Sequence, residues 1–181
     1  MLELLVVLVI IAILSALAAP SFTSLVQSNT ISSNVNTFLA DLRYARSESI
    51  RRGGGVIMCR SEFPEADQPI CAGDSASDSR GWASGWIVFH ALDPNASEGI
   101  KDSLNQLLRI QAPINSMDSI AEVGGSATRF RFTATGRLLS LNAPTALQFG
   151  DSPRFASSVQ RTVCVGLGGR ARIAGSGGSP C

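Results

Sequence analysis

The first 20 residues restrict the possible folds more than any other part of the chain. Residues 4–19 form an apolar run that only Ser15 interrupts, with Glu3 before it and Pro20 after it. A run of this length is about sufficient to cross a bilayer as a helix. A cleaved signal peptide would carry basic residues before a shorter apolar core, but no Lys or Arg precedes Arg43. The run therefore predicts a retained membrane helix.

The helix is expected to continue beyond the apolar run as an amphipathic segment. Apolar residues recur there at spacings of four and three, the pattern of one buried helix face: Ile31, Val35, Phe38, Leu42 and Ala45. The opposite face is predicted to be polar, with Asn34, Asn36, Asp41 and Arg43. Glycines at 53–55 should end the helix, and Arg51 and Arg52 suit the negative end of its dipole. We therefore predict one helix over residues 2–52.

Short strands are predicted for the rest of the chain, because β-rich runs alternate there with turn residues. The chain contains 17 Gly and 8 Pro, which fits a turn-rich β region. The predicted fold class is α+β, with an antiparallel β domain packed on the C-terminal half of the helix. The expected strands are residues 56–60, 85–91, 106–111, 128–134, 146–149, 161–165 and 170–174.

Four cysteines allow three disulfide pairings. Pairing Cys59 with Cys71 and Cys164 with Cys181 is favoured, because each bridge then closes a short loop within one region. Both bridges would require an oxidising compartment. A zinc site is disfavoured, since the sequence has no C-x-x-C and its single histidine is His90. No metal or other cofactor is expected.

The N-terminal segment is similar to that of type IV pilins and pseudopilins. Residues 2–22, LELLVVLVIIAILSALAAPSF, resemble the pilin N-terminal signature without its leader and first two mature residues. An ionisable group at the edge of a membrane span indicates a function. In pilins the residue matching Glu3 is implied to attract the N-terminal amine of a neighbouring subunit during assembly. A carboxylate that merely reaches the membrane surface is the alternative.

The pilin resemblance also implies a domain organisation and a location. Residues 1–27 would form the transmembrane and filament-core half of the helix, residues 28–52 its amphipathic half, and residues 53–181 the β domain. The protein would lie in the bacterial inner membrane as a single-pass protein before assembly. Afterwards it would join other pilins in a pilus, with the β domain on the periplasmic or extracellular side.

Two motifs in the β region resemble the GspH/FimT group of pilin-like proteins. GWASGWIVF, from Gly81, is similar to the W-x-x-G-W strand entry of that group, and FTATGRL, from Phe132, is similar to its F-x-x-x-G-R turn. In this order after a pilin-like helix, the two motifs identify the chain as a member of the group. Trp82 and Trp86 are expected first of all to be core aromatics.

The sequence gives little support for catalysis, and no catalytic residue is predicted. His90 is expected at the end of a strand, without a nucleophile motif or a carboxylate pair near it. Residues 166–171 read as G-x-G-x-x-A after a strand, which is the pattern of a dinucleotide-binding turn. That turn must open a helix, whereas the chain continues as RIAGSGGSPC. An enzyme is therefore not predicted.

The charges are unevenly distributed along the chain. Residues 61–122 carry ten acidic side chains against three basic ones, whereas residues 123–181 carry seven arginines against Asp151 alone. Such asymmetry suggests a basic surface for a polyanion. Arginine also offers a bidentate fork that suits phosphate.

The C-terminal sequence Gly169-Arg170-Ala171-Arg172 resembles the G-R-x-R tail motif of FimT-type minor pilins, which bind DNA during natural transformation. On an extended segment, Arg170 and Arg172 would point to the same side about 6–7 Å apart and could reach different phosphates. Gly168 and Gly169 would let the DNA backbone approach, and a Cys164–Cys181 bridge would hold the loop. Binding through phosphates should show little sequence preference. Three further arginines could extend the patch: Arg137, Arg154 and Arg161.

A second interpretation remains open. The chain could be a FimU-type minor pilin, or a pseudopilin of type II secretion, that primes filament assembly and binds only other pilins. Arg170 and Arg172 would then be ordinary solvated charges. Since both interpretations share the helix, only the C-terminal arginines distinguish them.

Overall fold

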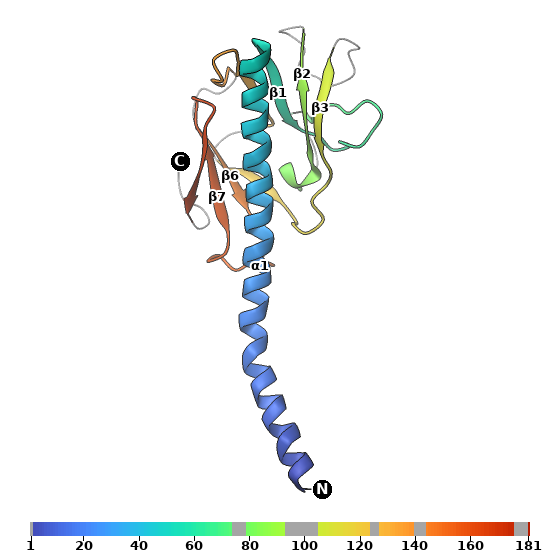
Figure 1. Ribbon diagram of the computed structural model, residues 1–181, viewed down its shortest axis with the longest axis vertical. Coiled ribbons are helices and arrows are strands. Elements are labelled where there is room, and N and C mark those ends of the chain that lie inside the picture. Colours follow the sequence, from blue (N-terminus) through green and yellow to red (C-terminus); the bar gives the residue numbers. More distant parts are fainter. Residues whose placement is uncertain (1, 74–78, 93–104, 124–126, 140–143, 176–180) are drawn as a thin grey trace.

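The computed structural model describes residues 2–73, 79–92, 105–123, 127–139, 144–175 and 181, except for the side chains of residues 16–21. A single helix, α1 (Leu2–Arg52), starts the fold and has the predicted bounds. It continues through Pro20 without interruption. Its C-terminal half packs against two sheets, while its N-terminal half extends away from them (Figure 1). The predicted α+β class is confirmed.

Two antiparallel sheets of four strands flank the helix. The first has the order β3-β2-β1-β5, from β3 (Gln106–Gln111), β2 (Trp86–His90), β1 (Gly54–Arg60) and β5 (Arg129–Thr133). The second has the order β4-β6-β7-β8, from β4 (Ile120–Val123), β6 (Thr145–Phe149), β7 (Arg161–Val165) and β8 (Ala171–Gly175). A short 3₁₀ helix, η1 (Trp82–Ser84), precedes β2. Figure 1 shows β1–β3 on one side of α1 and β6–β7 on the other.

The sequence predicted seven of the eight described strands to within two residues. The missed strand is β4, which has only four residues and offers too short a run for an alternating pattern. The last strand begins at Ala171, one residue later than expected, so Arg170 belongs to the preceding turn.

The predicted apolar face of α1 forms the centre of the core. Ile31, Phe38 and Ala45 are fully buried. The Phe38 ring lies 5.4 Å from the Trp82 ring and 5.5 Å from the Trp86 ring, in edge-to-face geometry at both contacts. The two tryptophans are therefore core aromatics, as expected.

Asp41 corrects the prediction for the polar face of the helix, because its side chain is buried. The Trp86 indole Nε1 donates a 2.8 Å hydrogen bond to Asp41 Oδ2, and Arg109 Nη1 lies 3.0 Å from Asp41 Oδ1. Burial raises the pKa of Asp41, and the Trp86 hydrogen bond and the Arg109 charge oppose that rise. A buried tryptophan needs an acceptor for its N–H, and Asp41 supplies one.

Both favoured disulfides are present. Cys59 is bonded to Cys71 across a separation of 12 residues, and Cys164 to Cys181 across 17. The second bridge fixes the C-terminal residue beside β7.

The N-terminal part of α1 makes few contacts with the sheets. Its described apolar side chains are mostly exposed, with 76% of Leu2 and 61% of Leu14 accessible. Part of the predicted membrane segment, residues 16–19, lies outside the described side chains. Among the described residues, no helical stretch combines the length and the apolarity that a membrane crossing needs.

Candidate nucleic-acid interface

The G-R-x-R sequence lies at the tip of the last hairpin, which joins β7 to β8. Within its turn, the Gly169 N–H donates to the Gly166 carbonyl and the Gly166 N–H donates to the Arg170 carbonyl, both at 2.9 Å. Ala171 packs against the core, and Arg170 and Arg172 on either side of it are exposed. Both predicted arginines are therefore accessible at the surface.

The disulfide pins the outer face of this hairpin. Arg172 is the cross-strand partner of Cys164, so the two side chains share a face of the sheet. Val163 and Val165, which alternate with Cys164, are buried in the core. The Cys164–Cys181 bridge therefore attaches the C-terminal residue on the same face that carries Arg172.

Gly169 packs against protein, which corrects the role expected for it. Its φ of 70° favours glycine, and a Cβ atom there would lie 2.1 Å from the Gly136 carbonyl oxygen. Nearby, the Leu138 N–H donates a 3.0 Å hydrogen bond to the Leu167 carbonyl. Gly169 is thus buried where the tail turn meets the G-R turn that contains Arg137, and it leaves little room for a DNA backbone.

The helix and the tail turn line a groove of about 370 Å³. The side chain of Arg46 reaches from the helix to the G-R turn, where its Nε donates a 3.0 Å hydrogen bond to the Gly136 carbonyl. The side of α1 that faces the groove carries one polar and two apolar residues besides its arginines. The lining residues are Leu42, Arg43, Arg46, Ser47, Ile50, Gly169, Arg170 and Ala171. We call this hollow the helix–tail groove.

Sequence reasoning missed Arg43 and Arg46 as partners of Arg170. Their signal was available, since residues 43, 46, 47 and 50 follow the spacing of one helix face. What the sequence could not provide was the position of the tail turn beside that face. Within the described part of the chain, Arg43, Arg46, Arg170 and Arg172 form no ion pair, and no acidic residue lines the groove.

Residues 34–169 match the family described as type II transport protein GspH. This chain belongs to the GspH family of pilin-like proteins. No curated protein matches its sequence. Because the family match ends at residue 169, Arg170 and Arg172 lie beyond it.

Two crystal structures of the type IV minor pilin FimU from Pseudomonas aeruginosa PAO1 resemble this GspH-family chain. Their TM-scores are 0.60 and 0.57, each at 17% sequence identity. The alignments cover 83% and 82% of this chain, and 95% and 98% of the FimU chains. At this identity the likeness shows a shared pilin-like fold.

Two of the arginines expected to extend the tail patch lie elsewhere in the GspH-family domain. Arg161 begins β7, about 13 Å from the end of that strand at which the tail turn starts. Its Nη1 donates to the carbonyls of Ser158 and Gln160. Arg154 Nη1 lies 3.5 Å from Asp118 Oδ1, so a carboxylate offsets its charge. Neither arginine adjoins the helix–tail groove.

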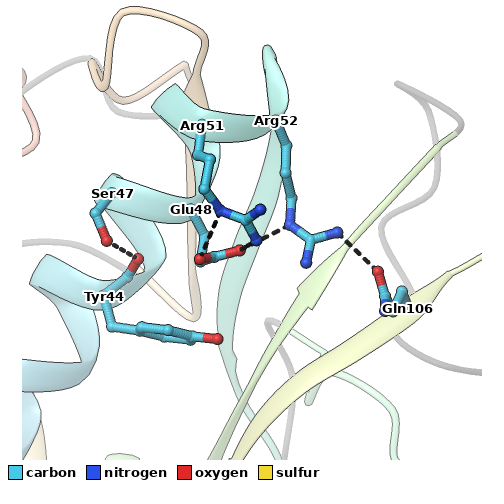
Figure 2. A network of polar contacts seen from close by, with 6 residues as sticks. All are labelled: Tyr44, Ser47, Glu48, Arg51, Arg52 and Gln106. Carbon is cyan, nitrogen blue, oxygen red and sulfur yellow. Dashed lines mark hydrogen bonds and ion pairs between the residues drawn. The ribbon is translucent and has the colours of Figure 1, made fainter.

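On another side of the same helix end, two arginines share one carboxylate. Glu48 accepts a 2.6 Å bond from Arg51 Nη2 and a 2.8 Å bond from Arg52 Nε, as Figure 2 shows. Arg52 Nη1 also donates to Gln106 Oε1 at 2.7 Å. Hydrogen bonds from Arg51 and then Arg52 lower the pKa of Glu48 to about 2. We call these three charged residues the Glu48 cluster.

The described residues of this GspH-family chain offer no candidate catalytic site. Burial and the neighbouring Arg52 charge lower the pKa of His90. Among the described residues, no three His, Cys, Asp or Glu side chains gather in a way that could hold a metal ion.

Proposed function

We propose that this GspH-family protein is a minor type IV pilin that binds DNA through its phosphates for uptake in natural transformation. The observation that supports this function best is a pair of exposed arginines, Arg170 and Arg172, on a disulfide-pinned hairpin. Neither forms an ion pair with a described residue, and an acid-free groove borders Arg170. Exposed, unpaired arginines can exchange counterions for phosphates without first breaking an internal ion pair.

The pinned hairpin lowers the cost of binding. An arginine on a free tail would lose conformational freedom when it captures a phosphate. Here the turn hydrogen bonds at Gly166 and Gly169 and the Cys164–Cys181 bridge hold the backbone in place beforehand. Arg137, on the adjoining turn, is also exposed and is included in the proposed surface.

The helix supplies the proposed location. Residues 1–27 would anchor the protein as a single-pass inner-membrane protein before assembly and would then enter the core of the filament. Glu3, at the start of α1, would receive the N-terminal amine of a neighbouring pilin. The β domain, with its arginines, would lie on the periplasmic or extracellular side, where its disulfides can form.

Assembly without DNA binding is the second candidate function, and a specific observation favours it. Two solved structures similar to this chain are of the minor pilin FimU. In that case the protein would prime a pilus or pseudopilus, and Arg170 and Arg172 would contact other pilins.

Salt-dependent DNA binding distinguishes the two functions. The full chain in a non-ionic detergent would be titrated with a fluorescent DNA duplex of mixed sequence, and anisotropy would be recorded over a salt series. We expect a log–log slope of about −2 to −4, largely lost in the Arg170→Ala/Arg172→Ala variant. The Arg51→Gln/Arg52→Gln variant is the matched control, because it removes the same charge from the Glu48 cluster. A folded chain that binds no DNA at low salt would instead indicate the assembly-only pilin.

A further inference from the structure

The helix–tail groove brings arginines from distant parts of the chain to one place. Arg43 and Arg46 come from the amphipathic half of α1, and Arg170 comes from the tail turn. Arg43 and Arg170 are exposed, and Arg46 is half-buried. Three like charges that share one hollow repel one another unless an anion is present. The arrangement therefore favours an anionic occupant.

Arg46 is held in position for such an occupant. Its Nε donates to the Gly136 carbonyl oxygen, which fixes the plane of the guanidinium. The other four N–H groups, on the two terminal nitrogens, remain for a ligand. A guanidinium fixed in this way loses little freedom when it binds a phosphate.

Gly169 supports this geometry as a positioning residue. The oxygen that holds Arg46 is the atom that a Cβ on Gly169 would approach to 2.1 Å. A side chain at residue 169 would therefore displace the Gly136 carbonyl and with it Arg46. The glycine of the G-R-x-R sequence thus links the tail turn to an arginine on the helix.

The remaining lining of the groove suits a DNA backbone. Ile50 and Ala171 contribute apolar surface to the groove, and the buried Leu42 lies behind them. Apolar surface beside a charge lowers the local dielectric and strengthens the attraction to a phosphate. It also offers contact to the apolar faces of the deoxyribose rings.

We propose that Arg43 and Arg46 bind DNA phosphates together with Arg170, so that the DNA-binding surface extends from the tail onto the helix. This inference rests on the proposed DNA-binding function and adds to it a second element of the fold. A strand that passes over Arg172 and the tail turn would continue into the helix–tail groove. The helix arginines would add one or two phosphate contacts to those of the tail.

A single substitution on the helix provides the test. Arg43→Gln in the full chain removes a charge from the groove and breaks no described hydrogen bond. Binding of the same fluorescent duplex over the salt series should weaken about two- to fivefold, the effect of one exposed ion pair. The salt slope should fall by about 0.9, the value for one phosphate of duplex DNA. Arg51→Gln is the control, since it removes an equal charge from the same helix within the Glu48 cluster.

A second variant tests the positioning of Arg46. Arg46→Lys keeps the charge but loses the bidentate fork and the bond from Nε. We expect its affinity to fall while its circular dichroism stays unchanged. If Arg43→Gln and Arg46→Lys both bind like the wild type, the helix contacts are wrong.

The outcomes separate this inference from the proposed function. If the wild type binds no DNA, both fail together. If Arg170→Ala/Arg172→Ala loses binding while both helix variants keep it, the tail function stands and only the helix contacts are overturned. If the helix variants weaken binding and the tail variant does not, the groove stands and the tail motif is the wrong site.

Discussion

Two groups of arginines lie on different sides of the C-terminal end of α1, and they differ in how their charges are compensated. In the Glu48 cluster, Arg51 and Arg52 share one carboxylate at 2.6 and 2.8 Å. In the helix–tail groove, Arg43 and Arg46 have no acidic neighbour among the lining residues. Arginine content alone therefore does not identify a polyanion site in this domain. We expect the presence or absence of a nearby carboxylate to decide which arginines bind a polyanion.

The two groups also depend on the fold to different extents. The Glu48 cluster forms within one turn of helix, from residues three and four apart, and requires only that α1 be helical. The groove requires contact between Arg46 and Gly136, which lie 90 residues apart. Changes to the tertiary structure should therefore damage the groove and spare the Glu48 cluster.

Removal of the tail disulfide should have the largest effect. Cys164→Ser with Cys181→Ser opens a loop with a separation of 17 residues, and such loops contribute about 3 kcal/mol. We expect that loss in chemical denaturation, together with weaker DNA binding, because the hairpin is no longer pinned. Cys59→Ser with Cys71→Ser is the comparison, since that bridge lies away from the groove. If Cys164→Ser/Cys181→Ser, while still folded, bound DNA as tightly as the wild type, the bridge would not be needed to position Arg170 and Arg172.

A smaller loss is expected when the G-R turn gains a side chain. In Gly136→Ala, the new Cβ would lie 2.8 Å from Arg46 Nε and 2.9 Å from Ile50 Cδ1, at a φ of 73°. Strain of this kind costs about 1–3 kcal/mol. DNA binding should weaken because Arg46 is displaced, and denaturation and anisotropy measure the two effects.

Gly168→Ala is the matched control for Gly136→Ala. Nothing lies within 4 Å of a Cβ at Gly168, although this glycine belongs to the tail turn that borders the groove. If both substitutions weaken DNA binding equally, the groove geometry is not the cause.

The division between local and long-range structure also explains what the sequence could predict. Periodicity and the glycines after Arg52 fixed the bounds of α1, and short loop lengths favoured the correct disulfides. The last strand was placed to within one residue, because its apolar run and the glycines before it are local signals. These features depend on residues close together in the chain.

Features that depend on distant residues were missed or misjudged. Asp41 looked like a surface residue because its partners, Trp86 and Arg109, are brought to it by the first sheet. Gly169 looked like a gap for DNA because its neighbour, Gly136, lies on another turn. Helix periodicity places Arg46 on a face, but only the packing of two turns shows what that face meets.

Neutralising Glu48 should make its cluster resemble the groove. Glu48→Gln leaves Arg51 and Arg52 without a carboxylate, and the cost in stability should be below about 1 kcal/mol, as for exposed ion pairs. Without the carboxylate, the guanidinium groups of Arg51 and Arg52 should tighten DNA binding. The loss of one negative charge should make the salt slope steeper by about one. Anisotropy over the salt series measures this change. Glu48→Asp is the control, because it keeps the carboxylate and should bind DNA like the wild type. An unchanged salt slope in Glu48→Gln would show that the nearby carboxylate is not what distinguishes the Glu48 cluster from the helix–tail groove.

The smallest effect concerns pH. Arg51 and Arg52 hold the pKa of Glu48 at about 2, below its ordinary value of 4.5. A lowered pKa means that the folded state favours the carboxylate. The stabilising contribution of Glu48 is therefore complete above about pH 4.5 and is lost as the pH falls through about 2. Between pH 4.5 and neutrality, the charge of the Glu48 cluster should not change, and its effect on DNA binding should stay constant. A carboxyl titration followed by NMR should show this low pKa in the wild type. In Arg51→Gln the pKa of Glu48 should move towards 4.5, because the hydrogen bonds from Arg51, which lower it most, are gone. An ordinary Glu48 pKa in the wild type would mean that the carboxylate does not hold the two arginines, and the contrast with the helix–tail groove would disappear.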